Sequence, residues 1–200
     1  MHIKPLIFDD FLDSASWTNL LEYYQKIAAF RYGHFSDQAV TDIPHWHSEY
    51  LFTNSNVQTN QEHILRANPN LAMVAAVWER LKEHHLKGHA LVRCYANAHT
   101  YGVEGAPHVD SAKPNNFTTL LYVVPDWKTQ WAGETSFFNE SGEVTTAVLP
   151  RPNRMITFDG TQLHAARAVS RECPALRITL MFKTVAPSTA SIAVDVKANP

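Results

Sequence analysis

Metal-binding side chains occur in this chain at a spacing that suits a shared ion. One residue separates His108 from Asp110, so on an extended segment both side chains point to the same side. His164 begins a later β-type run and can supply a third ligand from elsewhere in the fold. Two imidazoles and one carboxylate on one face of a borderline divalent metal such as iron(II) leave other coordination positions open. An oxygen-activating centre needs such open positions.

An arginine follows this set inside an apolar run. Arg177 stands thirteen residues after His164, in the strand-like run 176–182. A buried arginine is costly unless an anion pairs with it, and Thr179 would share its face of a strand. A guanidinium fork with a neighbouring hydroxyl suits a small dicarboxylate. Each of these two functional interpretations has an alternative. The His-x-Asp pattern could be a surface histidine near a turn aspartate, and Arg177 could be an exposed arginine on a sheet edge.

Helical patterns fill much of the first half of the chain. Apolar residues at helical spacing predict one helix that begins at Asp13 or Ser14 and another that begins at Pro69 and stops at Gly88. The inner stripe of the second helix is expected to contain Leu71, Val74, Ala75, Trp78, Leu81 and His85. Residues 31–60 are polar and aromatic without a clear period, which predicts a long surface segment.

Short β-type runs separated by turn residues fill the chain from Leu91 onward. Close spacing of such runs is typical of a sandwich or barrel rather than of alternating βαβ units. The predicted strands are Leu91–Tyr95, Thr118–Val124, Thr135–Phe138, Val144–Leu149, Met155–Phe158, His164–Val169 and Leu176–Thr184.

The composition limits the classes of partner. The chain has 200 residues, of which 45% are hydrophobic, and a net charge of −2, so a sizeable core is expected and a nucleic-acid partner is not. No apolar run approaches the roughly 18–20 residues of a membrane span. Acidic residues interrupt the first thirteen positions, unlike a signal peptide, and two cysteines are too few for a disulfide scaffold. We therefore expect a soluble, intracellular protein of the cytoplasm with no membrane contact.

Two further histidine pairs lack a third ligand at a convincing spacing. Side chains of helix neighbours such as His84 and His85 point about 100° apart and cannot easily share one ion. His45 and His47 flank Trp46 in the long segment. We interpret both pairs as surface or core-boundary residues; His45 and Trp46 either line a substrate cleft or pack with other aromatic side chains.

In combination, these motifs resemble the iron(II)/2-oxoglutarate-dependent dioxygenases, specifically the prolyl-hydroxylase-like branch with its prolyl 4-hydroxylases and hypoxia-type enzymes. The resemblance covers about half of the chain, from Leu91 to Thr184, in the order of the family. The matching text is Cys94-Tyr95, His108-Val-Asp110, Thr119-Leu-Leu-Tyr122, Pro125-Asp-Trp127, Gly133-Glu-Thr-Ser-Phe-Phe138, Pro152-Asn-Arg-Met-Ile-Thr-Phe158, His164 and Arg177-Ile-Thr-Leu.

The resemblance implies a mainly β fold with flanking α-helices and a double-stranded β-helix core, a cupin-like jelly roll. It implies one domain over 1–200, with mainly helical support in 1–90, the core in 91–184 and a tail in 185–200. The implied iron ligands are His108, Asp110 and His164, with no catalytic residue beyond the metal centre. The implied 2-oxoglutarate residues are Arg177, Tyr122, Tyr95 and Thr179.

The implied reaction consumes 2-oxoglutarate and dioxygen at iron(II), with ascorbate as a supporting reductant, and releases succinate and carbon dioxide. The expected substrate is a prolyl or other peptidyl residue. The alternatives are a free amino acid or other small molecule, or a cupin-type metal-binding protein without oxidative turnover. The oligomeric state stays open.

Two departures from the family pattern concern the segment before Arg177. The interval from His164 to Arg177 is longer than usual, which hints at an extended hairpin and leaves Arg167 as an alternative carboxylate partner. The collagen-type branch carries lysine where Arg177 stands, so the arginine favours the hypoxia-like or bacterial branch.

Two segments are expected to shape access to the site. We expect Asn97–Pro107 and the segment 31–60 to border the iron pocket.

Overall fold

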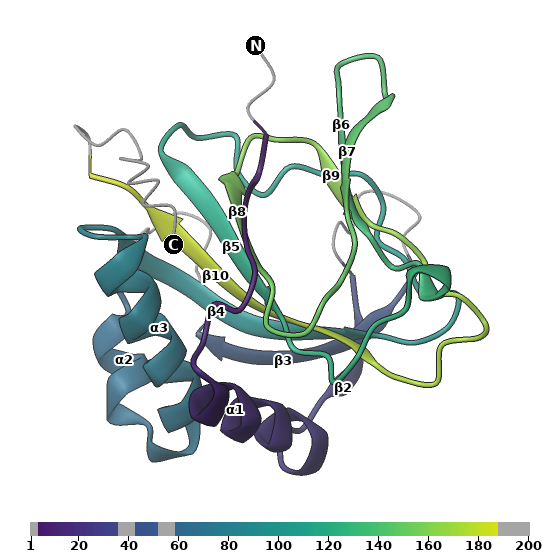
Figure 1. The fold of residues 1–200 in the computed structure, drawn as a ribbon. Coiled ribbons are helices and arrows are strands. Elements are labelled where there is room, and N and C mark those ends of the chain that lie inside the picture. Colours follow the sequence, from purple (N-terminus) through teal and green to yellow (C-terminus); the bar gives the residue numbers. More distant parts are fainter. Residues whose placement is uncertain (1–3, 36–42, 52–58, 188–200) are drawn as a thin grey trace, which may run out of the picture.

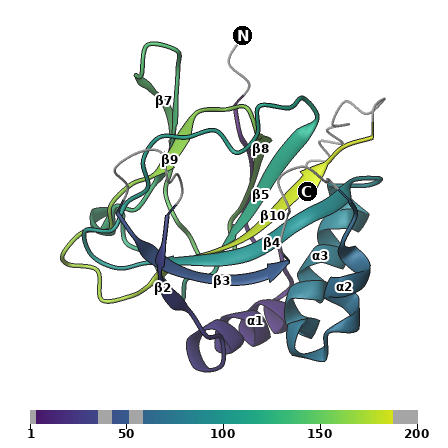
Figure 2. The same ribbon diagram turned by 180° about the vertical axis from the view of Figure 1, so that it is seen from behind.

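The computed structural model describes residues 4–35, 43–51 and 59–187. In these ranges the strands form two antiparallel sheets, and the helices pack against the outer face of the larger sheet (Figure 1 and Figure 2). The strands are β1 (Leu6–Phe8), β2 (Arg31–His34), β3 (His45–Leu51), β4 (Ala90–His99), β5 (Asn116–Tyr122), β6 (Thr135–Phe138), β7 (Val144–Val148), β8 (Met155–Asp159), β9 (His164–Ala166) and β10 (Arg177–Val185).

The two sheets differ in size and in strand order. The larger sheet has seven strands in the order β1-β8-β5-β10-β4-β3-β2, and the smaller one has three in the order β7-β6-β9. β10 therefore lies between β4 and β5 near the middle of the larger sheet. Figure 1 shows the smaller sheet facing β5, β8 and β10 across the interior of the barrel-like core.

Three α-helices and a short 3-10 helix cover the larger sheet on its outer side. They are α1 (Ser14–Lys26), α2 (Glu62–Ala67), η1 (Pro69–Leu71) and α3 (Ala72–His84). The Asp13 carboxylate accepts hydrogen bonds from the amides of Ala15 and Ser16 at 3.1 and 2.9 Å, which satisfies two orphan donors at the start of α1. α3 ends at His84, four residues before Gly88, where the sequence predicted the stop. Gly88 lies in the following turn at a positive φ of 81°, a conformation that favours glycine.

Two hydrophobic clusters lie on opposite sides of the larger sheet because neighbouring strand residues point to opposite faces. On β10, Ile178, Leu180 and Phe182 face the helices and pack in a cluster with Trp78 and Leu20. The alternate residues face the other way, where Met181 joins a second cluster between the sheets. That second cluster also contains Tyr95, Leu120, Tyr122, Phe137, Ile156 and Phe158.

Most expected elements are confirmed. All seven β-type runs from Leu91 onward form strands, although β4 extends four residues further, to His99, and β9 ends three residues earlier, at Ala166. Both helices are present, but the second one divides into η1 and α3, and its buried side includes Val77 as well as Val74, Trp78 and Leu81. A mainly β core with flanking helices is therefore correct.

The expectation of a plain surface segment over 31–60 is wrong where the structure describes it. β2 and β3 extend the larger sheet next to β4, and His45, His47 and Leu51 of β3 are buried. Polar and aromatic residues masked the strand pattern, since the buried positions of β3 are mostly histidines. The short helix α2 and the strand β1 were also not predicted from the sequence.

Residues 167–176 do not form the extended hairpin that the long interval hinted at. Val169 instead makes single bridges with Tyr101 and Ala132. Of the predicted tail, residues 188–200 lie outside the described residues. None of the helices in the described ranges is long and apolar enough to cross a membrane.

Candidate active site

Backbone hydrogen bonds bring the two halves of the His-Asp-His set together. The amides of His108 and His164 donate to each other's carbonyl groups, both at 3.0 Å. The Gly160 carbonyl accepts from the amides of Asp110 and Ser111 at 2.9 and 3.0 Å. An added Cβ at Gly160 would come within 3.1 Å of the Asn116 carbonyl oxygen, so this close approach favours glycine. The turn after β8 thus fixes the position of the His-x-Asp segment.

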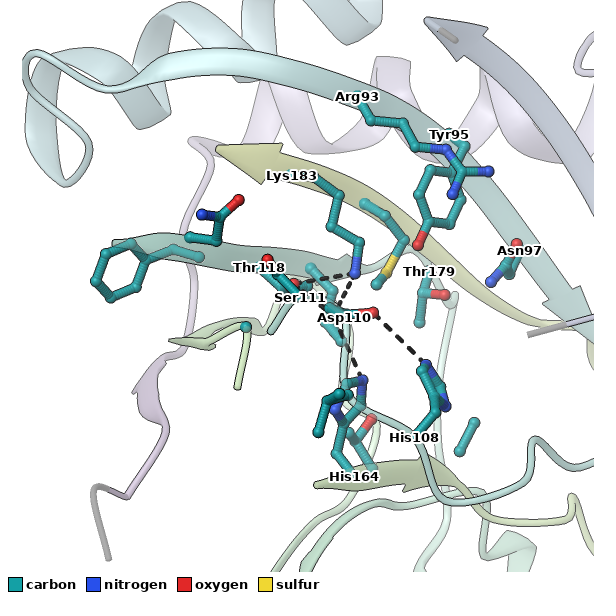
Figure 3. A pocket seen from close by; sticks show the side chains of 18 of the residues that line it. Arg93, Tyr95, Asn97, His108, Asp110, Ser111, Thr118, His164, Thr179 and Lys183 are labelled. Atoms are coloured by element: carbon teal, nitrogen blue, oxygen red, sulfur yellow. Dashed lines mark hydrogen bonds and ion pairs between the residues drawn. The ribbon is translucent and has the colours of Figure 1, made fainter. Parts of the chain in front are cut away.

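The three side chains meet as the sequence predicts. Their candidate ligand atoms lie within 4.8 Å of one another, and the Nε2 atoms of His108 and His164 each lie 3.5 Å from an Asp110 carboxylate oxygen (Figure 3). The opposite ring nitrogens, both Nδ1, contact the backbone carbonyls of Ala106 and Gln162 at 2.9 Å. An Nδ1–H that donates to a carbonyl leaves Nε2 as the atom with a lone pair, which is the form that binds a metal.

Asp110 is held by side chains of two strands. Thr118 of β5 donates a hydrogen bond to its Oδ2 atom at 2.5 Å, and the Lys183 ammonium of β10 forms an ion pair with the same oxygen (Figure 3). Burial raises the pKa of the Asp110 carboxyl, but Lys183, His164 and His108 lower it, and the net pKa lies well below its usual value. The carboxylate is therefore ionised and ready to bind a cation.

The two histidines have different electrostatic surroundings. Burial lowers the pKa of His164 to about 4 in spite of the nearby Asp110 carboxylate. Burial also lowers the pKa of His108, but the hydrogen bond and the charge of Asp110 raise it by a larger amount. The net pKa of His108 therefore lies above its usual value. His164 is thus neutral at neutral pH, while the Asp110 carboxylate favours the protonated form of His108.

Arg177 is buried, with 2% of its surface exposed, and its guanidinium is only partly satisfied. Nε donates to the Gly133 carbonyl at 2.5 Å and Nη2 to the Thr135 hydroxyl at 3.0 Å. Tyr122 also interacts with the guanidinium, so at most three of its five N–H donors are used, and none of the ion pairs among the described residues involves it. An anion of suitable size would satisfy the remaining donors.

A cavity of about 510 Å³ is lined by Arg177 and by all three candidate metal ligands, His108, Asp110 and His164. Tyr95 and Thr179, which the resemblance assigned to 2-oxoglutarate, also line it. Tyr122 lies behind this wall: its hydroxyl contacts Thr135 Oγ1 at 2.6 Å and the Val148 carbonyl at 3.1 Å, and the Arg177 guanidinium lies 5.3 Å from its ring centre. The arrangement places the three candidate metal ligands and the buried guanidinium in one cavity.

Several cavity residues escaped the sequence analysis. Lys183 shares the inward face of β10 with Arg177 and Thr179, so the two-residue period of that strand already pointed to it. Asn97 and His99 line the cavity from β4, which means that the predicted border segment 97–107 begins inside a strand. Among the described residues, neither ring nitrogen of the buried His99 has a hydrogen-bond partner. Nothing in the sequence signalled Thr118.

The interpretation of the other histidine pairs needs one correction. His34 of β2 lies close enough to His45 and His47 to be a third candidate ligand, because it pairs with His45 across the β2–β3 ladder. His84 and His85 remain outside both groups of metal-binding side chains found among the described residues. Arg167, the alternative carboxylate partner, lies near Glu104 at 3.8 Å with 47% of its side chain exposed, and it does not line the cavity found in the described ranges.

Comparison with known proteins gives the class of the chain. Residues 92–182 match the model of the 2OG-Fe(II) oxygenase superfamily. No curated protein matches the sequence. The matched residues contain His108, Asp110 and His164, so the region 92–182 is a 2OG-Fe(II) oxygenase domain by this comparison.

Solved structures share the fold at low sequence identity. A prolyl hydroxylase from Trichoplax adhaerens in complex with a hypoxia inducible factor oxygen degradation domain peptide fragment is 16% identical, with a TM-score of 0.59 over 90% of this chain and 83% of that one. A prolyl-4-hydroxylase from Pseudomonas putida is 12% identical, with a TM-score of 0.57 over 92% of each chain. HygX from Streptomyces hygroscopicus with nickel and 2-oxoglutarate bound is 11% identical, with a TM-score of 0.61 over 94% and 84%.

Proposed function

We propose that this oxygenase binds iron(II) through His108, Asp110 and His164, binds 2-oxoglutarate through Arg177, and hydroxylates a prolyl or other peptidyl residue. The observation that carries the site assignment is the shared cavity, in which two correctly oriented imidazoles and an ionised carboxylate face the same space as a buried, partly satisfied guanidinium. The donor set fits iron(II).

Each residue has a defined task in this proposal. The Ala106 and Gln162 carbonyls hold the imidazole rings so that Nε2 faces the metal, and Thr118 holds the Asp110 carboxylate in its rotamer. Arg177 and Thr179 bind the distal carboxylate of 2-oxoglutarate, with Tyr95 beside them in the cavity wall. Iron, dioxygen and 2-oxoglutarate together supply the oxidising chemistry, in which 2-oxoglutarate becomes succinate and carbon dioxide and one oxygen atom enters the substrate.

Tyr122 acts as a positioning residue in this proposal. Its hydroxyl hydrogen-bonds Thr135, which in turn accepts a hydrogen bond from Arg177 Nη2. Gly133 completes the support, since its carbonyl accepts from Arg177 Nε and an added Cβ would come within 3.2 Å of Arg177 Cδ. The fork of the guanidinium is therefore held before a carboxylate arrives, which lowers the entropy cost of binding.

The proposal of a peptidyl substrate is supported by the structures that share this fold. Two of the three similar structures described above are prolyl hydroxylases, and one of these is in complex with a peptide fragment. His34 of β2 and Val109, which is 46% exposed, are part of the cavity wall. An extended peptide could lie across these residues while a single side chain enters the cavity.

One observation favours the small-molecule alternative. The Lys183 ammonium lines the cavity beside the metal-binding group, and Lys113 and Arg93 also contribute to the wall. A cation next to the reacting centre suits the carboxylate of a free amino acid better than the neutral backbone of a peptide. The second candidate function is therefore hydroxylation of a free amino acid or another small acid.

Substrate-stimulated turnover of 2-oxoglutarate tests both candidates. The purified protein with iron(II), 2-oxoglutarate and air, with and without ascorbate, is screened against proline-containing peptides, the same peptides with alanine in place of proline, and free amino acids. Succinate release and the mass of one added oxygen atom are measured. Stimulation by proline peptides and not by their alanine versions supports the first candidate.

A substrate with its carboxylate blocked separates the second candidate from the first. If a free amino acid is hydroxylated, its carboxamide should be a poor substrate, and Lys113→Met, which removes an exposed cation of the cavity wall, should raise KM for the acid more than it lowers kcat. Hydroxylation of the acid and the amide at equal rates would contradict a role for a wall cation in substrate binding. Failure of every substrate, with no basal succinate release, would contradict the oxygenase assignment of this site.

A further inference from the structure

A second cluster of imidazoles lies apart from His108, Asp110 and His164, which we call the His108 group. It stands on the two strands at one edge of the larger sheet. The candidate ligand atoms of His34, His45 and His47 lie within 4.8 Å of one another. His34 pairs with His45 in the β2–β3 ladder, and His47 follows two residues later on the same face of β3. His45 and His47 are buried, with 0% and 8% of their surface exposed.

The ring orientations bring nitrogens together from different directions. The rings of His34 and His47 stack with centres 3.8 Å apart and 14° between their planes, while the ring of His45 stands at 79° to that of His34 with centres 5.2 Å apart. A metal binds an imidazole nitrogen in the plane of the ring, so one of the stacked rings of His34 and His47 must turn before both can share an ion with His45. In a tetrahedral zinc site with Zn–N bonds of about 2.0–2.1 Å, the nitrogens must draw closer than the spacing found here.

Outer contacts of the kind that support metal-binding histidines are present. His47 contacts the Glu49 carboxylate through Nε2 and the Asn97 amide oxygen through Nδ1, both at 2.7 Å. Arg93 holds Glu49 by two hydrogen bonds of 2.9 Å. A carboxylate behind a histidine orients the ring and raises its basicity toward a metal on the other nitrogen. Metal binding would replace one of the two contacts of His47 and keep the other.

We propose that His34, His45 and His47 form a second metal site, selective for a late divalent transition metal such as Zn²⁺. Three imidazoles are a donor set that zinc prefers, and three protein ligands leave a fourth position for water or a ligand. The ion would join β2 to β3 where His34 borders the cavity. The site is independent of the proposed hydroxylation, because none of its residues belongs to the His108 group.

Titration of the metal-free, full-length protein with Zn²⁺ tests the proposal. Zinc can also occupy the His108 group, so the wild type should bind two equivalents in isothermal titration calorimetry. His34→Ala should lose one equivalent, and His108→Ala should lose the other. His63→Ala, which removes an exposed histidine of α2, should lose neither. Circular dichroism and thermal unfolding of each variant check that it is folded.

A second readout covers variants that fail to fold. His34→Gln is the fallback for His34→Ala, since His34 is only half-buried. In the His108→Ala background, Co²⁺ should give the strong visible absorption of a four-coordinate, imidazole-rich site, and Glu49→Gln should weaken Co²⁺ binding about 10–100-fold. The proposal is overturned if the wild type binds one equivalent of Zn²⁺ that disappears in His108→Ala, or if His34→Ala and His34→Gln keep both equivalents. In that case the three rings only pack together.

Discussion

Each candidate metal-binding side chain of the His108 group has at least one protein partner that fixes its direction. Carbonyl groups hold the Nδ1 atoms of His108 and His164, and Thr118 with Lys183 holds Asp110. Such support keeps the ligand atoms close to a productive geometry before the metal binds. The group therefore contains no spare ligand, and each member should be necessary.

We predict that His108→Ala, Asp110→Ala and His164→Ala each abolish 2-oxoglutarate turnover and weaken iron(II) binding. With only three protein ligands, the loss of one leaves no substitute. Succinate release and iron(II) affinity are measured side by side, with His63→Ala as the matched control that keeps both. Normal decarboxylation in the His164→Ala protein would remove that residue from the ligand set.

Arg177→Ala should raise the concentration of 2-oxoglutarate required for turnover and leave iron(II) affinity nearly unchanged. Removal of one partner of a buried charge pair costs on the order of 2–5 kcal/mol. The KM for 2-oxoglutarate and the iron(II) affinity are measured separately. Arg167→Ala is the control, because that arginine is about half-exposed and lies beside Glu104. An unchanged KM in Arg177→Ala would assign the carboxylate to Arg167 or to a lysine.

At the scale of elements, β3 and β4 are joined by a charged network on the cavity side. Glu49 of β3 accepts two hydrogen bonds from Arg93 of β4 and one contact from His47. Burial raises the pKa of the Glu49 carboxyl, but the hydrogen bonds with Arg93 and His47 lower it to about 2. Because this value lies below that of an unfolded glutamate, the network stabilises the fold when Glu49 is ionised.

The sign of the pH effect follows from that shift. The contribution of Glu49 to the free energy of unfolding is fully present above about pH 4.3, the pKa of a glutamate in the unfolded chain. It is lost as the pH falls toward about 2, the pKa of Glu49 in the folded chain. We predict that the wild type loses about 1–2 kcal/mol more than Glu49→Gln between neutral pH and pH ~3, after allowance for solvent screening.

Urea unfolding at several pH values measures this difference in the free energy of unfolding. Glu140→Gln, in the exposed turn after β6, is the control and should follow the wild type at every pH. Parallel stability curves for the wild type and Glu49→Gln would mean that the network contributes nothing to the folded state.

At the scale of the whole molecule, β10 connects the helical layer with the cavity. Its outward residues pack under α3, where Phe182 lies 6.0 Å from Trp78 between ring centres, and its inward residues include Arg177 and Lys183. Damage to the outer core should therefore lower the stability of the molecule and, through the same strand, disturb the position of the cavity residues.

Leu180→Ala should destabilise the protein by about 2–5 kcal/mol, because Leu180 is fully buried and its loss leaves a cavity. Leu176→Ala, just before the same strand, removes a side chain that is 41% exposed and should cost within about 0.5 kcal/mol. Chemical denaturation gives both values. Equal costs for the two substitutions would show that the outer face of β10 is not tightly packed.

The sequence by itself determined the parts of this protein that depend on local order. Strand runs from Leu91 onward show their two-residue period directly, and the same period puts His108 beside Asp110 and Arg177 beside Thr179. Turn residues such as those of 159–160 mark where each strand ends. These features need only near neighbours in the chain, so they could be predicted without the fold.

Only the tertiary structure decided which distant segments meet. The contact of Lys183 with Asp110 depends on β10 lying next to β5, and the grouping of His34 with His45 and His47 depends on the pairing of β2 with β3. Strand pairing between remote segments is set by the burial of whole faces against the helices and the second sheet. No short stretch of sequence carries that information, and for this reason the histidine cluster and the contact of Lys183 with Asp110 became visible only in the folded chain.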